Sequence, residues 1–186
     1  MTRDKYRGTY AADLKRMLPR LPIVDGFFEF VDAGRRLAEL HLNYETITPF
    51  PLGGLDIEPR GDAYDFFAVK KMKFGKATAA QKAAGMKHDR TVIVVNDKVA
   101  LRDIPDEAHR YNVGTRSAIE WLLDRYRVKL DKTSGITNDP NAWSREIGDP
   151  RYIVDLIARV VAVSVATIKI VDELPSLETG ATPPIS

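Results

Sequence analysis

Seven positively charged side chains gather in residues 69–90, VKKMKFGKATAAQKAAGMKHDR, a segment that we call the basic stretch. Only Asp89 opposes them, whereas the whole chain has a net charge of +2. Lysine and arginine bind nucleic-acid phosphates because each neutralised phosphate releases condensed counterions. The stretch is therefore a candidate DNA-binding surface, and the alternative is a solvated loop. The seven residues are Lys70, Lys71, Lys73, Lys76, Lys82, Lys87 and Arg90.

Side chains that could act in catalysis are scattered. The histidines at positions 41, 88 and 109 are far apart in sequence, which argues against a catalytic triad or a zinc site. His41 and Glu45 would share a helix face, but no third metal ligand is evident, so we expect a structural hydrogen-bonded pair. Trp121 is expected in the core, whereas stacking on a base and a structural role are equally open for Trp143.

Motifs of nucleotide-dependent and hydrolytic enzymes are absent from the sequence. Gly75-Lys76 resembles the end of a P-loop, but the required earlier glycine is Lys70 and the required serine or threonine is Ala77. No GxGxxG, GxSxG or Glu-x-Lys pattern occurs. We therefore expect a domain that is not an enzyme. The alternative is a nuclease built from Asp and Glu residues at distant positions.

The first half of the chain is predicted to begin with helices and continue as β structure. Residues 5–18 form one helix, and residues 25–44 form a second, because their apolar residues recur at three- and four-residue steps after a cap at Asp25. The basic stretch is expected to be a long connection between strands. The predicted strands are 64–70, 72–74, 91–95 and 99–101, and the last two form a hairpin with a turn at Asn96-Asp97.

The second half is predicted to be helical. Thr115 or Ser117 caps a helix that ends near Val128, and residues 131–141 form a loop. Asp149-Pro150 then opens a helix that extends to about Leu174. This helix includes residues 160–165, whose β-branched side chains would suit a strand, because the start signal and the uninterrupted length favour a helix.

The composition is that of an ordinary globular protein, with 186 residues, 44% hydrophobic, 29% charged and no cysteine. The absence of cysteine excludes disulfides and thiolate metal sites. The N-terminus lacks the apolar run of a secretory signal, and charged residues interrupt the longest apolar segment, so neither secretion nor a membrane span is expected. We expect a cytoplasmic protein.

Three segments resemble the C-terminal specificity domain of Type ISP restriction-modification enzymes. They are LPRLPIVDGFFEFVDAGRRLAELHLNYE (18–45), VIVVNDKVALRDIPDEAHRYNVGTRSAIEWLLDRYRVKLDKTSGITNDPNAW (92–143) and DPRYIVDLIARVVAVSVATIKIV (149–171). In that family a nuclease, a helicase-like translocase, an N6-adenine methyltransferase and a target-recognition domain form one polypeptide. The resemblance implies that ATP, magnesium and S-adenosylmethionine bind to the other domains. It does not extend to the basic stretch position by position.

We therefore predict an α+β fold, with a β-rich recognition region between N- and C-terminal helices that pack together. The expected function is sequence-specific recognition of duplex DNA, which positions an adenine for the methyltransferase. The alternative is a structural module that docks the methyltransferase and helicase-like domains and contacts DNA little. The expected parts of this single structural unit are 1–48, 49–104 with the basic stretch, 105–174 and a flexible tail at 175–186.

Overall fold

The structure is a computed structural model, and it describes residues 8–16 and 26–175. Some of the predictions fall outside these residues. They concern both ends of the helix at 5–18, the cap at Asp25 and nearly all of the tail at 175–186.

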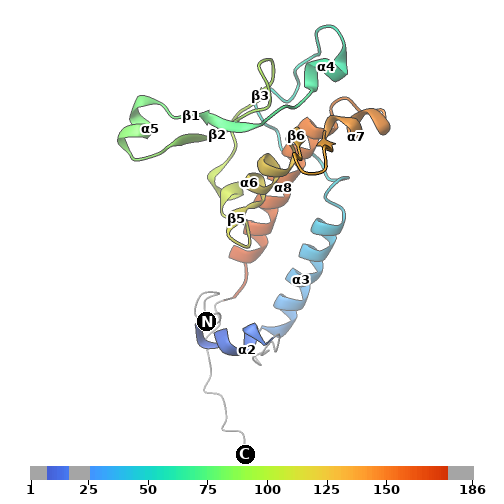
Figure 1. The fold of residues 1–186 in the computed structure, drawn as a ribbon. Coiled ribbons are helices and arrows are strands. Elements are labelled where there is room, and N and C mark those ends of the chain that lie inside the picture. Colours follow the sequence, from blue (N-terminus) through green and yellow to red (C-terminus); the bar gives the residue numbers. More distant parts are fainter. Residues whose placement is uncertain (1–7, 17–25, 176–186) are drawn as a thin grey trace, which may run out of the picture. The chain divides into compact units, whose positions relative to one another are not determined.

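The chain divides into two compact units, Met1–Glu39 with Ile170–Ser186, and Leu40–Lys169. The first contains α2 (Ala11–Lys15) and most of α3 (Phe27–Leu42), which Figure 1 shows in blue. The helix predicted at 25–44 is confirmed in its described part. The helix predicted at 5–18 is interrupted, since α2 begins only after a turn at Tyr10.

The second unit contains a three-stranded antiparallel sheet in the order β1 (Lys73–Lys76), β2 (His88–Val94) and β3 (Ala100–Leu101). The predicted hairpin between the last two strands is confirmed, with Ile93 opposite Leu101. Its turn depends on Asn96, whose Oδ1 accepts hydrogen bonds from the backbone N–H groups of Lys98 and Val99, each at 2.8 Å.

The strand predicted at 64–70 is wrong, because this segment begins with the helix α4 (Ala63–Phe67). Asp62 starts the helix, since its carboxylate accepts a hydrogen bond of 2.9 Å from the backbone N–H of Asp65. Phe66 and Phe67 are both buried, which a short helix allows and a strand with one solvent-exposed face would not. The expected strand at 72–74 is present only from Lys73 onward, as the start of β1.

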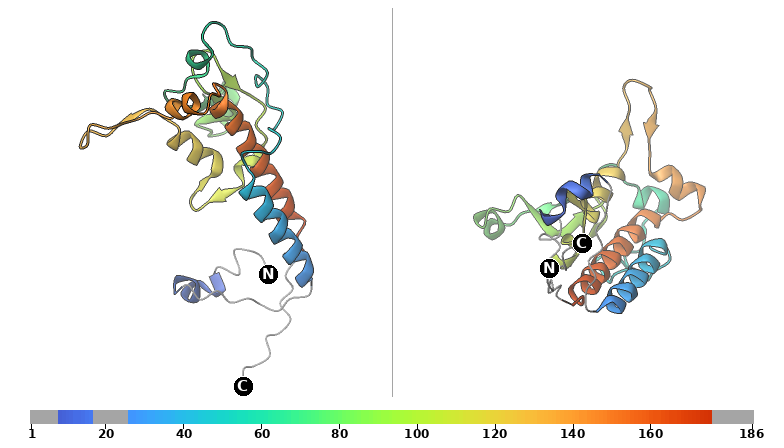
Figure 2. Two further views of the ribbon diagram at one scale, coloured as in Figure 1. Left: turned by 90° about the vertical axis from the view of Figure 1, so that its right-hand side faces the viewer. Right: turned by 90° about the horizontal axis from the view of Figure 1, so that it is seen from below.

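Residues 105–138 contain more β structure than predicted. After the 3₁₀ helix η1 (Asp106–His109), the strands β4 (Asn112–Val113) and β5 (Arg116–Ser117) form a short hairpin. The helix α6 (Ala118–Arg125) is capped by Ser117, one of the two predicted caps. A further hairpin, β6 (Lys129–Leu130) and β7 (Thr137–Asn138), occupies much of the predicted loop and extends away from the neighbouring elements in both views of Figure 2.

The long C-terminal helix is confirmed as α8 (Tyr152–Asp172), and it follows the short helix α7 (Asn141–Glu146). Residues 160–165 are helical despite their β-branched side chains. The hydroxyl of Ser164 donates a hydrogen bond of 2.7 Å to the carbonyl of Val160, one turn earlier. Burial explains the helix, because α8 supplies a large part of the core.

The core of the second unit joins α8 to the sheet and to α6. Its fully buried members include Ile93, Leu101, Ile119, Ile157 and Val161.

The N-terminal helix α3 and the C-terminal segment contact each other within each unit. In the first unit, Arg36 and Glu173 form an ion pair of 3.2 Å. In the second unit, His41 Nε2 lies 3.4 Å from the hydroxyl of Thr167 on α8. The predicted α+β class is confirmed. Among the described residues, no helix is long and apolar enough to cross a membrane.

Candidate nucleic-acid interface

The predicted connection between strands is present at residues 77–87, between β1 and β2. The basic stretch also contains β1 itself and the start of β2, so it forms most of a β-hairpin. β1 leads outward, the short helix α5 (Ala79–Ala83) lies at the far end, and β2 returns (Figure 1). We call the unit formed by β1, α5 and β2 the arm, and the positive charges are distributed along it and at its base. Lys70 and Lys71 precede β1, Lys73 and Lys76 lie on β1, Lys82 lies on α5, Lys87 precedes β2, and Arg90 lies on β2.

The two strands of the arm approach each other closely at Gly75. The register shifts between Phe74 and Gly75, which marks a β-bulge. A Cβ atom at Gly75 would lie 3.0 Å from the Cβ of Val92 and 3.3 Å from that of Asp89. Glycine therefore permits the close pairing, and this pairing holds the exposed residues Lys73 and Lys76 on β1.

The far end of the arm is fixed by its own hydrogen bonds. Thr78 and Gln81 form a capping box, in which the hydroxyl of Thr78 accepts from the backbone N–H of Gln81 at 3.2 Å. In return, the side-chain oxygen of Gln81 accepts from the backbone N–H of Thr78 at 2.8 Å. Gly85 has a φ of +81° after α5, which turns the chain back toward β2.

The six lysines of the basic stretch are all exposed. In the described part of the chain, none of their ammonium groups pairs with a carboxylate within 4.0 Å. The neighbouring Asp89 is engaged with Thr91, whose hydroxyl donates to it at 2.6 Å, and this hydrogen bond lowers the pKa of the carboxyl. The six ammonium groups are thus available to an external polyanion.

Arg90 differs from the lysines because it is already held in place. Its guanidinium lies 3.6 Å from a carboxylate oxygen of Glu120 and 5.8 Å from the centre of the Phe74 ring. The carbonyl of Arg90 accepts a hydrogen bond of 2.9 Å from Nε2 of His109, which identifies the tautomer with hydrogen on Nε2 when the imidazole is neutral. Burial, followed by the charge of Arg90, lowers the pKa of His109. Arg90 therefore connects β2 to α6 and η1.

The backbone that enters the basic stretch is held by Asn141 and Asn96, and the sequence did not predict this role for either asparagine. Asn141 accepts from the N–H of Val69 and donates to its carbonyl, both at 2.8 Å. Nδ2 of Asn96 donates to the carbonyls of Phe66 and Ala68, both at 2.9 Å. The segment around Asn141 has the Asx turn that its composition indicates, but its spacing gives no sign of a contact with Val69, 72 residues earlier.

The base of the arm also joins the β6–β7 hairpin. The carbonyl of Lys70 accepts a hydrogen bond of 2.9 Å from the N–H of Val128, and Lys71 forms an antiparallel bridge with Arg127. Lys129 on β6 and Lys132 in the following turn are exposed and lie outside the predicted set. The bridge therefore places a second group of cations next to the first.

The remaining candidates from the sequence are Trp121, Trp143 and the predicted pair of His41 and Glu45. The expectation that Trp121 lies in the core is wrong, because its side chain is only half-buried. The guanidinium carbons of Arg116 and Arg125 each lie 5.3 Å from its ring centre. Trp143 is exposed. Glu45 accepts hydrogen bonds from the hydroxyls of Tyr152 and Tyr44. Across the described ranges, no group of three or more potential metal ligands comes together.

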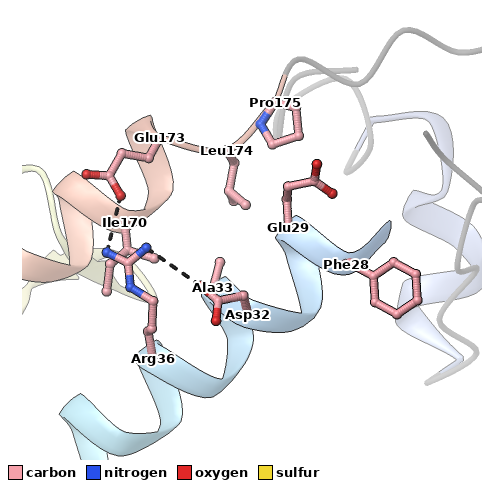
Figure 3. A pocket seen from close by; sticks show the side chains of 9 residues that line it. All are labelled: Phe28, Glu29, Asp32, Ala33, Arg36, Ile170, Glu173, Leu174 and Pro175. Atoms are coloured by element: carbon pink, nitrogen blue, oxygen red, sulfur yellow. Dashed lines mark hydrogen bonds and ion pairs between the residues drawn. The ribbon is translucent and has the colours of Figure 1, made fainter. Parts of the chain in front are cut away.

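A groove in the first unit has a different character. Figure 3 shows that it is bordered by Glu29, Asp32 and Glu173, and Arg36 is the one cation among the described residues that line it. Arg36 is paired with Glu173 at 3.2 Å and lies 3.9 Å from Asp32. This acidic border disfavours a phosphate backbone, so the basic stretch is the better candidate for a nucleic-acid interface.

Comparison with known proteins identifies related domains. The model of the Type ISP C-terminal specificity domain matches residues 1–156, whereas no curated protein sequence matches. One similar structure is a nuclease-deletion mutant of the Type ISP restriction-modification enzyme LlaGI in complex with a DNA substrate mimic, with 38% identity over 95% of this chain and 13% of that chain, and a TM-score of 0.74.

Two further structures are similar. The ATP-dependent Type ISP restriction-modification enzyme LlaBIII bound to DNA has 36% identity over 95% of this chain and 10% of that chain, with a TM-score of 0.74. The DrdV–DNA complex has 30% identity over 94% of this chain and 17% of that chain, with a TM-score of 0.70. The present chain thus spans less than a fifth of each of the three similar chains.

Proposed function

Because the chain belongs to the Type ISP C-terminal specificity domain family, we propose that it recognises a specific sequence in duplex DNA as part of a larger restriction-modification polypeptide. All three similar structures described above, those of LlaGI, LlaBIII and DrdV, contain DNA or a DNA substrate mimic. The observation that carries the proposal in this chain is the folded arm with six exposed lysines. Their ammonium groups would contact phosphates, and neighbouring polar side chains would contact base edges.

The recognition would position an adenine for an N6-adenine methyltransferase elsewhere in the polypeptide. ATP, magnesium and S-adenosylmethionine would bind to that and other domains, and this chain would contribute binding without catalysis. The relative lengths of the chains support this proposal. The match covers only 10% of the LlaBIII chain, which leaves most of that longer polypeptide for other domains. Phosphate contacts fix the register of a protein on duplex DNA, which is the task of such a domain.

A docking module for the methyltransferase or helicase-like domains is the second candidate function. Phe27 and Phe28 on α3 favour it, since they are 62% and 80% exposed and their rings lie 5.6 Å apart. Exposed aromatic side chains are typical of protein–protein contacts. A domain that only docks would have no use for the lysines of the arm, so the two functions differ in their dependence on these residues.

Replacement of Lys71, Lys73 and Lys76 by alanine tests the proposed function. Each lysine that neutralises a phosphate adds about 0.9 to the slope of log affinity against log salt. The triple variant should therefore flatten this slope by up to about 2.7 and weaken binding to all duplex sequences alike. Fluorescence titration with a labelled random duplex at several salt concentrations measures both quantities.

The matched control replaces Lys15, Arg35 and Lys169, which are exposed on helices outside the basic stretch, by alanine. This control changes the net charge by the same amount. It should retain most of the slope of the parent chain. If the Lys71, Lys73 and Lys76 variant binds duplex DNA with the parent affinity and slope, the basic stretch is not the interface and the docking function is favoured.

A further inference from the structure

We propose that the β6–β7 hairpin is a second DNA-contacting element, which enters a groove of the duplex next to the phosphates held by the basic stretch. This inference rests on the proposed function, since it assumes that the chain binds duplex DNA. It adds an element that contacts base edges through apolar side chains, whereas the lysines contact phosphates. Leu130 and Ile136 are the residues that carry it.

The hairpin is exposed along its whole length. Every residue from 128 to 139 is exposed, and β6 and β7 pair only with each other in the described part of the chain. Leu130 is 56% exposed and Ile136 is 68% exposed. Figure 2 shows the hairpin extending away from the neighbouring elements of its own unit in both views. Neither apolar side chain therefore contributes much to the core, which leaves them available for a partner.

The turn of the hairpin is fixed before any partner binds. The carboxylate of Asp131 accepts hydrogen bonds from the N–H groups of Thr133 and Ser134 at 2.8 Å and 3.0 Å, and these bonds lower its pKa. The N–H of Gly135, which has a φ of +72°, donates to the carbonyl of Asp131 at 2.8 Å. A turn that is already ordered loses less conformational entropy on binding than a flexible loop would.

The charge of the hairpin favours a polyanion such as a nucleic acid over a basic or apolar partner. Lys129 and Lys132 are exposed, and Arg127 lies at the base, although it also pairs with Asp124 at 3.2 Å. The single carboxylate between 127 and 138, that of Asp131, is directed into its own turn. The outer surface thus combines positive charge with two apolar side chains.

The connection to the basic stretch supplies the second argument. Through the Lys71–Arg127 bridge and the hydrogen bond from Val128 to Lys70, the hairpin begins where the basic stretch begins. Phosphates held by Lys70 and Lys71 would therefore lie next to the groove that the hairpin enters. A two-stranded ribbon fits the major groove of B-DNA, which is about 12 Å wide, and there apolar side chains contact the methyl group of thymine.

The first test compares the 186-residue chain with a Leu130→Ala, Ile136→Ala double variant. Both side chains are exposed, so stability should change little. We expect duplex affinity to fall roughly tenfold with an unchanged salt slope, because apolar contacts are lost and ionic contacts remain. Val113→Ala, on the β4–β5 hairpin, is the matched control and should bind as the parent chain does.

The second test is independent of affinity and uses the absence of native cysteine. Saturating duplex DNA should slow the alkylation of the Ile136→Cys thiol by a maleimide severalfold, and should leave that of the Val113→Cys thiol nearly unchanged. Equal rates with and without DNA at position 136, or equal slowing at both positions, would overturn the proposal.

Different results would refute DNA binding by the chain and DNA contact by the β6–β7 hairpin. If the parent chain binds duplex DNA, and the Lys71, Lys73 and Lys76 variant reduces the salt slope, then parent-like binding by the Leu130 and Ile136 double variant overturns only the role of the hairpin. If the parent chain shows no salt-dependent binding to duplex DNA, both the proposed function and the role of the hairpin are overturned.

Discussion

An Asn141→Ala substitution should lower the free energy of unfolding. The Asn141 side chain forms hydrogen bonds with the backbone of Val69, as a neighbouring strand would. Its amide oxygen and nitrogen each form a hydrogen bond of 2.8 Å with Val69, which is fully buried. Asp139 orients the amide by accepting a third hydrogen bond of 2.7 Å from Nδ2. Alanine would leave the N–H and carbonyl of Val69 without these partners.

The expected loss follows from the number of backbone groups affected. A buried polar group that loses its partner costs about 1–3 kcal/mol, so two groups at a partly buried site should cost about 2–4 kcal/mol. Alanine has a higher helix propensity than asparagine, which returns about 0.5 kcal/mol at the start of α7. The net loss is about 1.5–3.5 kcal/mol, which corresponds to a fall in Tm of roughly 3–14 °C for a chain of this size.

Urea unfolding followed by circular dichroism measures this loss, with Asn138→Ala as the control. Asn138 is exposed on β7, so its replacement should change the free energy of unfolding by less than about 0.5 kcal/mol. Asn141→Asp should be at least as destabilising as Asn141→Ala, because a carboxylate cannot donate to Val69 and would face Asp139. A loss below about 0.5 kcal/mol for Asn141→Ala would refute the reasoning.

Two further predictions concern the elements around Arg90. Ser117→Ala removes the hydroxyl that accepts from the N–H of Glu120 at 3.2 Å, so urea unfolding should show a loss of about 1 kcal/mol, and an unchanged midpoint would contradict this. For His109, whose folded pKa lies below 6.5, the unfolded state takes up the proton first as the pH falls. The free energy of unfolding should therefore fall below pH 6.5, and less so in His109→Asn; equal pH dependence in both chains would exclude this role.

The long helices could be predicted from the sequence because their signals are local. The start signal at Asp149-Pro150 and the uninterrupted length after it predicted a helix, although residues 160–165 are β-branched. The helix α8 confirms this prediction. Ser117 was one of two possible caps, and the geometry of the capping box identifies it. The family resemblance came from the same helical segments and was confirmed over residues 1–156.

The missed elements depend on contacts that a local pattern does not contain. The aromatic residues of 64–67 resemble a strand, and only the cap at Asp62 indicated the helix α4. The β6–β7 hairpin is stabilised by the turn at Asp131 in a segment whose polar composition indicated a loop. The hydrogen bonds between Asn141 and Val69 join residues 72 positions apart, so no spacing rule could have identified them.

The outer part of the basic stretch is separable from the rest of the fold. Buried apolar residues end at Ala77 and resume only at Ile93, and the capping box of Thr78 and Gln81 closes the end of the arm with local bonds. Residues 78–88 can therefore be exchanged for a segment of another length or composition without repacking the interior. During evolution, residues 78–88 could therefore change rapidly in sequence while the rest of the domain kept its fold.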